Sequence, residues 1–169
     1  MTGPRSTDKR RERKIPRLIL VRHAHRDTSL GRERDNGLSG KGWRQAAAFA
    51  TWASESLPRE SVALLSSPKR RCLETFDPLG RSVRVWPSLG EQRARESDAA
   101  FRKRVARALR AALRQPVKAV LLCSHGDWLP VAADVLLGRP LDWRKGAWKE
   151  FRVPNRSLRQ GAELVNPDR

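Results

Sequence analysis

The chain has 169 residues, of which 36 are lysine or arginine and 18 are aspartate or glutamate, so its formal net charge is +18. This length favours a single domain with a proper core, and a hydrophobic content of 38% excludes a disordered composition. No apolar run approaches the length of a transmembrane helix, and residues 1–16 are basic but lack the apolar stretch of a signal peptide. We therefore predict a disordered basic tail over 1–16, followed by one cytoplasmic domain over 17–169 with no membrane partner.

In chain order, short apolar runs alternate with segments of helical periodicity. We expect strands at 17–21, 62–65, 83–86 and 117–123, and candidate edge strands at 150–153 and 161–165. The expected helices are 41–56 capped by Ser39, a short helix after Pro68, 99–114 capped by Ser97 or Asp98, and 128–137 ending at Gly138. Residues 26–37 are expected to form a loop after the first strand. This alternation predicts an α/β fold, a three-layer sandwich with a mostly parallel central sheet.

Two of the expected helices have an apolar face that we can assign. In the first long helix, the residues that recur at helical spacing are Trp43, Ala46, Ala47 and Ala50. In the second they are Phe101, Val105, Ala108, Leu109 and Ala112. The arginines on the other face of the second helix are interpreted as solvated.

The two cysteines and the high charge indicate little on their own. Cys72 and Cys123 have neither a metal-site spacing nor a pairing pattern, which favours a reduced chain without a disulfide.

Arginine matches phosphate oxygens with paired hydrogen bonds, so the charge favours anionic ligands. No nucleic-acid-binding motif accompanies it, and we favour a solvated basic surface over a nucleic-acid interface.

Two of the expected strands end in a histidine. The apolar run before Arg22-His23 and the run before Ser124-His125-Gly126 both read as buried strands. Open α/β sheets bind their ligands at the carboxyl ends of the strands. We therefore expect a single site assembled from both strand ends.

Three motifs, in this order, resemble those of the histidine phosphatase superfamily, also called the phosphoglycerate mutase-like family. They are Arg22-His23-Ala24, Ser67-Pro68-Lys69-Arg70-Arg71-Cys72-Leu73-Glu74-Thr75 and Ser124-His125-Gly126. Weaker similarities lie at 38–46, Leu89-Gly90-Glu91, 96–105 and 153–158. The resemblance spans most of the chain after the tail and implies that family's phosphoglycerate mutase-like fold.

The resemblance implies a role for five residues. His23 is the expected nucleophile toward a phosphoryl group, and Glu91 is the expected proton donor to the leaving group. The expected phosphate-binding residues are Arg22, Arg71 and a protonated, also catalytic, His125. The family's arginine stands three residues after the proline, which selects Arg71 over Arg70. Since these groups supply the positive charge, we expect no metal and no cofactor.

Several neighbours of these residues have two interpretations. Glu96 is an alternative acid or a surface carboxylate, and His25 lines the pocket or belongs to the loop. Asp127 and Trp128 shape the pocket wall or start a helix. Cys72 replaces the family's usual alanine and is interpreted as a small buried side chain rather than a nucleophile.

Departures from the family pattern narrow the expected function. Residues 24–27 read Ala-His-Arg-Asp instead of the Gly-Glu-Thr of sugar-phosphate mutases, and the chain is short, which favours a small phosphatase. We expect a metal-independent phosphatase that hydrolyses small-molecule or protein-borne phosphomonoesters through a phosphohistidine. The first alternative is a protein phosphohistidine phosphatase, which would not need Glu91. The second is a non-catalytic phospholigand or nucleic-acid binder on the same fold.

Overall fold

The computed structural model of the chain describes residues 16–154, 158 and 162–165. Of the tail expected over 1–16, residues 1–15 lie outside the described residues, and Pro16 is buried. The start of the last expected strand at Gly161 and residues 155–157 of the late family segment also lie outside the described residues. Among the described residues, no helix is long and apolar enough to cross a membrane.

Six strands form one sheet in the order β3-β2-β4-β1-β5-β6. In chain order they are β1 (Arg17–Arg22), β2 (Val62–Ser66), β3 (Val83–Val85), β4 (Ala119–Ser124), β5 (Trp148–Arg152) and β6 (Glu163–Leu164). The four strands from β3 to β1 pair in parallel, whereas β5 pairs antiparallel with β1 and β6. The prediction of a mostly parallel α/β sheet is therefore confirmed.

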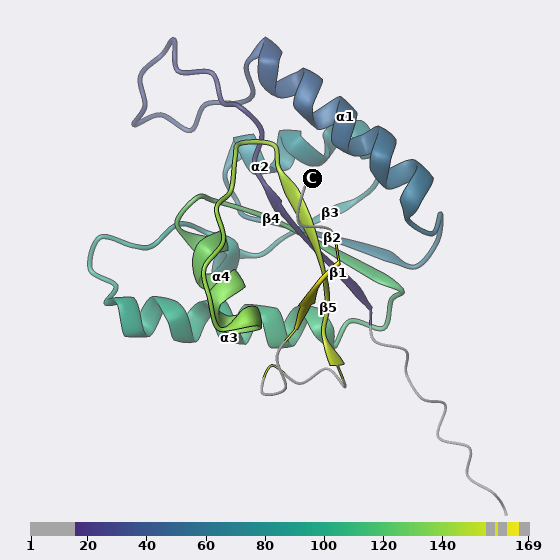
Figure 1. Cartoon of the computed structure of the whole chain (residues 1–169). Helices are drawn as coiled ribbons and strands as arrows, with labels where there is room; N and C mark the ends of the chain where they lie inside the picture. The colour runs from purple at the N-terminus through teal and green to yellow at the C-terminus, as the bar shows by residue number, and fades with distance from the viewer. Residues whose placement is uncertain (1–15, 155–157, 159–161, 166–169) are drawn as a thin grey trace, which may run out of the picture.

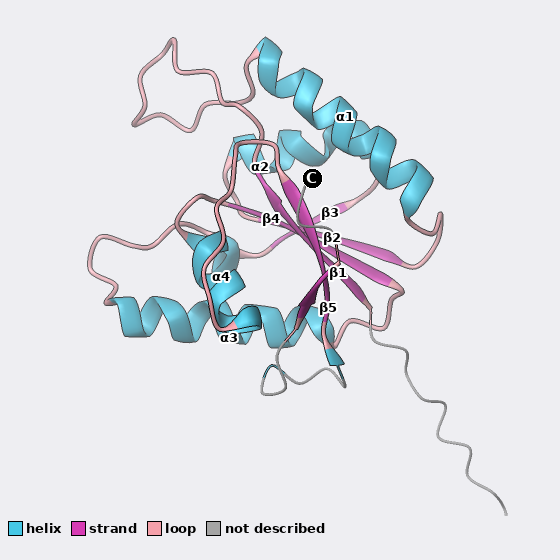
Figure 2. Ribbon diagram, in the orientation of Figure 1, coloured by secondary structure: helices cyan, strands magenta, loops and turns pink. Residues whose placement is uncertain are grey.

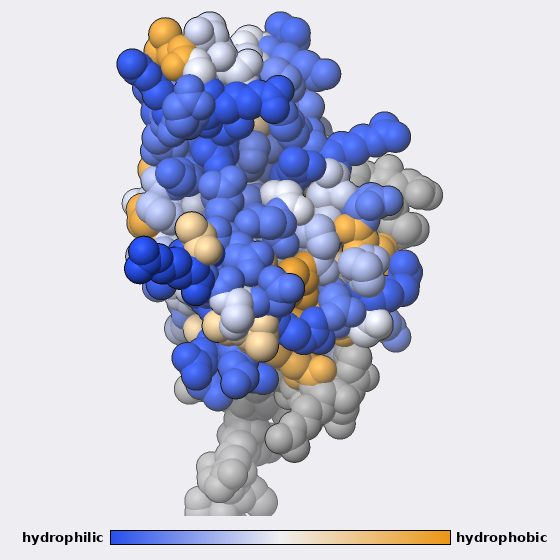
Figure 3. Space-filling model, turned by 90° about the vertical axis from the view of Figure 1, so that its left-hand side faces the viewer, coloured by the Kyte–Doolittle hydropathy of each residue, from blue (hydrophilic) through white to orange (hydrophobic). Residues whose placement is uncertain are grey.

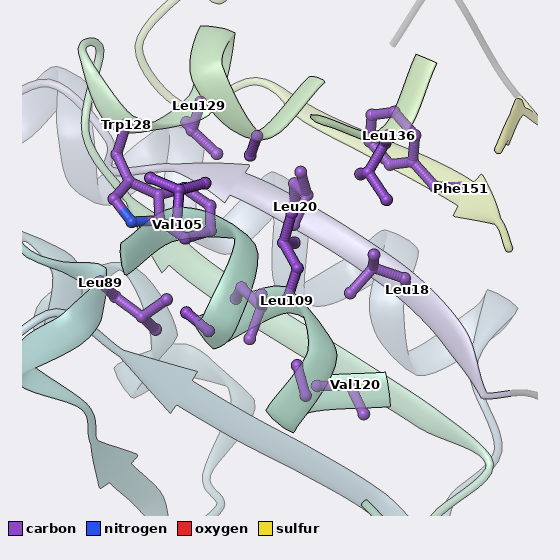
Figure 4. Close-up of a cluster of buried hydrophobic side chains, with 14 of the residues drawn as sticks. Leu18, Leu20, Leu89, Val105, Leu109, Val120, Trp128, Leu129, Leu136 and Phe151 are labelled. Atoms are coloured by element: carbon purple, nitrogen blue, oxygen red, sulfur yellow. The ribbon is translucent and has the colours of Figure 1, made fainter. Parts of the chain in front are cut away.

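Helices cover both faces of the sheet, giving three layers (Figures 1 and 2). The helices are α1 (Gly40–Ser56), α2 (Arg70–Phe76), α3 (Asp98–Leu113) and α4 (Trp128–Leu137). Alternate residues of β1 point to opposite cores: Leu18 and Leu20 pack with α3 and α4, and Ile19 and Val21 pack with α1 and α2. Figure 4 shows the first of these cores. Because β1 is a central strand that is buried on both faces, the four residues before Arg22 are all apolar.

The helix ends follow the predicted capping chemistry. The hydroxyl of Ser39 accepts from the backbone N–H of Gly42, and that of Ser97 accepts from Ala100, which selects Ser97 over Asp98 as the cap of α3. Helix α4 ends at Gly138, whose backbone has the left-handed conformation with φ of +73°.

Three sequence expectations about packing are wrong. The expected edge strand over 150–153 is β5, which lies inside the sheet with a partner on each side, while β6 and β3 are the edges. In α1, Trp43 is 41% exposed and Ala47 is exposed. The buried face of α1 is instead Gly42, Ala46, Phe49 and Ala53. The helix is turned this way because Gly42 packs against the His25 carbonyl, where a Cβ would lie only 2.1 Å from the oxygen.

Candidate active site

The carboxyl ends of β1 and β4 bring His23 and His125 together. These strands are parallel neighbours with Arg22 opposite Ser124, so the residues that follow each strand emerge at the same edge. The backbone N–H of His23 donates to the Ser124 carbonyl over 3.1 Å, which joins the two strand ends. The two imidazole rings lie 5.3 Å apart between centroids, so the expected meeting of both histidines at one site is confirmed.

His23 is fixed in one tautomer. Its side chain is 5% exposed, and its Nδ1 lies 2.8 Å from the backbone oxygen of Ala24. A carbonyl oxygen only accepts, so Nδ1 carries the hydrogen and the neutral ring has its lone pair on Nε2. Burial, followed by the nearby charges of His125, Arg71 and Arg22, lowers the pKa of His23 to about 3, although the bond to Ala24 acts in the opposite direction. His23 is therefore a neutral imidazole with a free Nε2 near pH 7.

His125 lies deeper, with 1% of the residue exposed. Its Nε2 is 2.7 Å from the Ser67 hydroxyl and its Nδ1 is 3.1 Å from Nη2 of Arg71. Because a guanidinium only donates, Nδ1 accepts from Arg71 and the Nε2–H group donates to Ser67. Burial, then Arg71 and Lys69, lower the pKa of His125 to about 3. His125 is therefore neutral in the free site, because burial of the ring and the cations around it disfavour the protonated form. The predicted protonated His125 concerns the site with a bound phosphoryl group, and it stays a prediction.

Two arginines line the same site from different elements. Arg71, at the start of α2, is 3% exposed, whereas Arg70 points outward and its Nε donates to Glu74 over 2.6 Å. Arg22, the last residue of β1, donates from Nη1 to the Trp143 carbonyl. Among the described residues, Nε of Arg22 and Nε of Arg71 are buried without a hydrogen-bond partner. Both guanidinium groups therefore keep donor capacity that an anion would satisfy.

Gly126 makes room for one of these arginines. A Cβ at this position would lie 2.7 Å from Nη2 of Arg22, closer than side-chain carbons come to such atoms. The glycine of the Ser-His-Gly motif is thus explained by the close approach of the Arg22 guanidinium to the backbone.

Of the two candidate acids, the structure places only Glu91 in the site. Its Oε1 accepts from Nη2 of Arg71 over 2.7 Å and lies 3.6 Å from Nδ1 of His125, while 47% of its side chain stays exposed. Glu96 is bound instead by Arg104, whose hydrogen bond is the main cause that lowers the pKa of Glu96 to about 2. Glu96 is therefore an ion-pair residue outside the pocket.

Eight residues line an open pocket. Four of them are predicted site residues, and the other four had no predicted role or two alternative interpretations. The pocket is lined by Arg22, His23, Arg26, Arg71, Glu91, Gly126, Asp127 and Lys145. His125 lies directly behind Arg71 and beside Ser67, which was also assigned no role. Gly126 could have been identified from its place in the Ser-His-Gly motif. Lys145 belongs to no motif, and only the folded loop before β5 brings it here.

The residues with two interpretations are now distinguished. His25 is a loop residue, since its Nδ1 lies 2.8 Å from the Ser39 hydroxyl and it does not line the pocket. Asp127 lines the pocket and also caps α4, where its Oδ1 accepts from the backbone N–H of Trp128. Trp128 is fully buried and belongs to the core. Cys72 and Cys123 are buried free thiols.

The arrangement is suited to binding an oxyanion next to a nucleophilic nitrogen. It combines the buried Arg71 guanidinium, the half-buried Arg22 guanidinium, a neutral imidazole with a free Nε2, and the partly exposed Glu91 carboxylate. Within the described part of the chain, no group of three or more His, Cys, Asp or Glu side chains could hold a metal ion.

Comparisons with known proteins agree with this geometry. The sequence model described as "Histidine phosphatase superfamily (branch 1)" matches residues 18–95. This confirms the resemblance of the first two motifs and of Leu89-Gly90-Glu91, whereas Ser124-His125-Gly126 lies beyond the matched residues. No curated protein matches the sequence.

Solved structures share the fold over nearly the whole chain. An open-reading-frame product of Mycobacterium tuberculosis has a TM-score of 0.73 and 21% identity, covering 89% of this chain and 96% of its own. A phosphoserine phosphatase from Entamoeba histolytica, solved with 3-phosphoglyceric acid, has a TM-score of 0.71 and 18% identity over 90% and 96%. A mycobacterial glucosyl-3-phosphoglycerate phosphatase, solved with VO3, has a TM-score of 0.64 and 22% identity over 89% and 98%. At these identities the likeness establishes the fold.

Proposed function

We propose that this chain, which carries the sequence model of the histidine phosphatase superfamily over residues 18–95 and that family's fold, hydrolyses phosphomonoesters through a phosphohistidine on His23. The observation that carries the proposal is the neutral His23 ring, with Nε2 free, in one pocket with the buried Arg71 and the half-buried Arg22. A neutral imidazole is a competent nucleophile only where cations offset the negative charge of the phosphoryl group.

In the first step, Nε2 of His23 attacks the phosphorus atom while the bond from phosphorus to the ester oxygen breaks. The hydrogen bond from Nδ1 to the Ala24 carbonyl orients the ring and stabilises the positive charge that it gains. Glu91 takes up a proton as the phosphoryl anion replaces it on Arg71. It donates this proton to the departing alkoxide, so an alcohol leaves and Glu91 becomes a carboxylate. The products of this step are the alcohol and a phosphoryl group bonded to His23.

In the second step, a water molecule attacks the phosphorus atom and the bond between nitrogen and phosphorus breaks. The Glu91 carboxylate accepts the proton from this water, which returns Glu91 to its acid form. His23 is released as the neutral ring, and inorganic phosphate leaves. Both steps use the same carboxyl group, in opposite directions.

Arg22 and Arg71 hold the phosphoryl oxygens in both steps, and His125 joins them when the anion binds. A phosphate dianion next to the site offsets the cations that keep His125 neutral, so its pKa rises on binding. Nδ1 of His125, which accepts from Arg71 in the free site, then carries a proton, and the Arg71 donor turns to the bound anion. The imidazolium becomes a third charged donor beside Arg22 and Arg71. The predicted role of His125 is in this way retained for the bound state.

The location of Glu91 favours a phosphomonoester over a phosphohistidine as the substrate. An alkoxide needs a proton to leave, whereas a phosphoramidate leaves more easily without one. The phosphoserine and glucosyl-3-phosphoglycerate phosphatases that share the fold are, by name, enzymes of phosphomonoesters. The supply of positive charge by protein side chains also leads us to propose catalysis without a metal.

Hydrolysis of 4-nitrophenyl phosphate tests the proposal. His23→Ala should lower kcat at least about a thousandfold, since it removes the nucleophile, while His25→Ala, a neighbouring loop histidine, should retain activity within about threefold. Radiolabelled phosphate that stays on the wild-type protein after rapid quenching, and that is lost in acid but not in alkali, would support the phosphohistidine. Dialysis of the protein against EDTA should leave the rate of hydrolysis unchanged. Activity of His23→Ala near that of wild type would refute the proposal, and a wild-type protein that binds phosphate without turnover would identify the non-catalytic alternative.

A further inference from the structure

We propose that the natural substrate carries a second anionic group, a carboxylate or another phosphate, and that Arg26 and Lys145 bind it beside the phosphoryl pocket. The inference rests on the proposed function, because it assigns the part of the substrate that lies beyond the ester oxygen. It is carried by the position of these two side chains and by the charges around them.

Arg26 and Lys145 line the same pocket as His23, Arg22 and Arg71 although they come from distant parts of the chain. Arg26 follows β1 by four residues, and Lys145 lies in the turn that leads into β5. Because β1 and β5 are antiparallel neighbours, the end of one strand and the start of the other meet at one edge of the sheet.

The backbone holds the Lys145 turn against the site. The N–H of Gly146 donates to the His23 carbonyl over 3.1 Å, and the N–H of Arg22 donates to the Ala147 carbonyl over 2.9 Å. Gly146 has φ of +78°, a left-handed conformation that glycine adopts without strain. Lys145 is therefore placed by the same strand end that places the nucleophile.

One side chain of α1 clamps both segments. The side-chain oxygen of Gln45 accepts from the backbone N–H of His25 over 2.8 Å, and its Nε2 donates to the Lys145 carbonyl over 2.9 Å. The residue before Arg26 and the backbone of Lys145 are thus joined through a single amide.

The charges around these two residues favour an anionic ligand. The carboxylate of Glu91 pairs with Arg71. Across the described residues, by contrast, no carboxylate lies within 4 Å of the Arg26 guanidinium or the Lys145 ammonium. Partial burial and four cations, Arg22, Arg26, Arg32 and Lys41, lower the pKa of Lys145. Of these cations, Arg22 and Arg26 line the pocket together with Lys145, while Glu91 and Asp127 supply its carboxylates. A second anion beside Arg26 and Lys145 would relieve the repulsion between these two cations.

The face of the molecule that carries the 26–38 and 90–97 loops is predominantly hydrophilic (Figure 3). Arg26 is itself half-buried, and its Nη1 donates to the Arg32 carbonyl over 3.2 Å, a contact within the same loop that leaves the guanidinium accessible to a ligand. An arginine fork and a lysine ammonium together match a carboxylate or a phosphate group. Uncharged leaving groups would gain nothing from them.

Three competitors that differ in one group test the inference. They are 3-hydroxypropyl phosphate, 3-phosphonooxypropanoate and propane-1,3-diyl bisphosphate, measured as competitive inhibitors of 4-nitrophenyl phosphate hydrolysis at constant ionic strength. We expect the carboxylate, the bisphosphate or both to have a Ki at least about tenfold below that of the hydroxyl compound. The carboxylate and bisphosphate values show which anion the subsite prefers.

Matched variants assign any preference to this subsite. Arg26→Met with Lys145→Met should reduce the ratio of Ki values to within about twofold, and Lys145→Arg should retain most of it. Arg110→Met with Lys118→Met is the control, because it removes two positive charges at exposed positions near the end of α3 and just before β4. Lys118 lies at the amino end of its strand, opposite to the carboxyl ends that form the pocket, so the ratio should stay unchanged.

The outcomes separate the two proposals. Equal Ki values for all three compounds on an active wild-type enzyme would overturn the second-anion subsite and leave the phosphatase function standing, and this result needs no variant. A preference that survives in the Arg26 and Lys145 double variant would also overturn it. Absence of 4-nitrophenyl phosphate hydrolysis in the wild type would reject the proposed function itself and the inference with it.

Discussion

The charge that prepares the pocket for a phosphoryl group also keeps its histidines neutral. Burial and nearby arginines lower the pKa of both His23 and His125 to about 3, against an ordinary value of 6.5. In the unfolded chain both rings take up a proton as the pH falls through about 6.5, whereas in the folded protein neither does so until about 3. Between these values the unfolded state binds more protons, so stability falls as the pH falls.

This linkage predicts a loss of stability on mild acidification. From pH 7 to pH 5 the free energy of unfolding should fall by up to about 2 kcal/mol for each of the two histidines. The window lies above the range in which carboxylates ordinarily titrate, so histidines dominate the slope. Chemical denaturation at several pH values measures it.

The contribution of a single ring can be isolated by substitution. His23→Asn should have a shallower slope than wild type over the same window, because one of the two non-protonated rings is gone. His25→Asn should keep most of the slope, because partial burial and Lys145 lower the pKa of His25 less than the pocket lowers those of His23 and His125. A wild-type stability that does not change between pH 7 and pH 5 would contradict neutral histidines in the folded site.

At the level of elements, the pocket depends on how the loop over 26–38 is attached to α2. The Glu74 carboxylate accepts from the backbone N–H of Leu38 over 2.6 Å and from Nε of Arg70 over 2.6 Å. Asp35 accepts from the backbone N–H of Arg70 over 3.1 Å. The loop that carries Arg26 is therefore joined to the helix that carries Arg71.

Glu74→Ala should destabilise the protein and loosen this loop. It leaves the buried N–H of Leu38 without its acceptor, which costs about 2 kcal/mol and lowers Tm by roughly 4–8 °C. Trypsin should cut faster after Arg32 and Arg34 in the variant. Glu60→Ala, at an exposed position, should change Tm by less than about 2 °C. Wild-type Tm and cleavage rate in Glu74→Ala would show that the attachment does not stabilise the loop.

The elements themselves were largely predictable, because their signals are local. Apolar runs located all six strands, and Ser39, Ser97 and Gly138 marked helix ends through capping chemistry. The rotation of α1 was not predictable, since it follows from the contact of Gly42 with a carbonyl seventeen positions earlier in the chain. The short 3-10 helices Asp77–Leu79 and Pro87–Leu89 were missed for want of any periodicity over three residues.

The site was predictable only where a motif marks it. His23, Arg71 and His125 each stand in such a motif, and the structure places all three together. Lys145 became visible only after β5 paired with β1, because its proximity to Arg26 arises from strand pairing. The neutral state of His125 could not be read from the sequence either, since it depends on the burial and charges of the folded site.

On the scale of the whole molecule, the formal net charge of +18 should draw anions toward the protein. The range of this field depends on salt, because the Debye length shrinks from about 30 Å at 10 mM to about 8 Å at 150 mM ionic strength. Charges outside the pocket therefore reach a phosphate ester only at low salt, whereas the buried Arg71 and the half-buried Arg22 contact it in the pocket and are screened much less.

We accordingly expect kcat/KM for 4-nitrophenyl phosphate to fall by about threefold or more when sodium chloride raises the ionic strength from about 10 to 150 mM, with kcat nearly constant. Arg107→Glu with Arg110→Glu, at exposed positions of α3, lowers the net charge and should make this dependence shallower. At high salt this variant and wild type should have the same kcat/KM, because only the screened field differs between them. A salt dependence that is as steep in the variant as in wild type would assign the effect to the pocket arginines alone and remove any role for the overall charge in substrate capture.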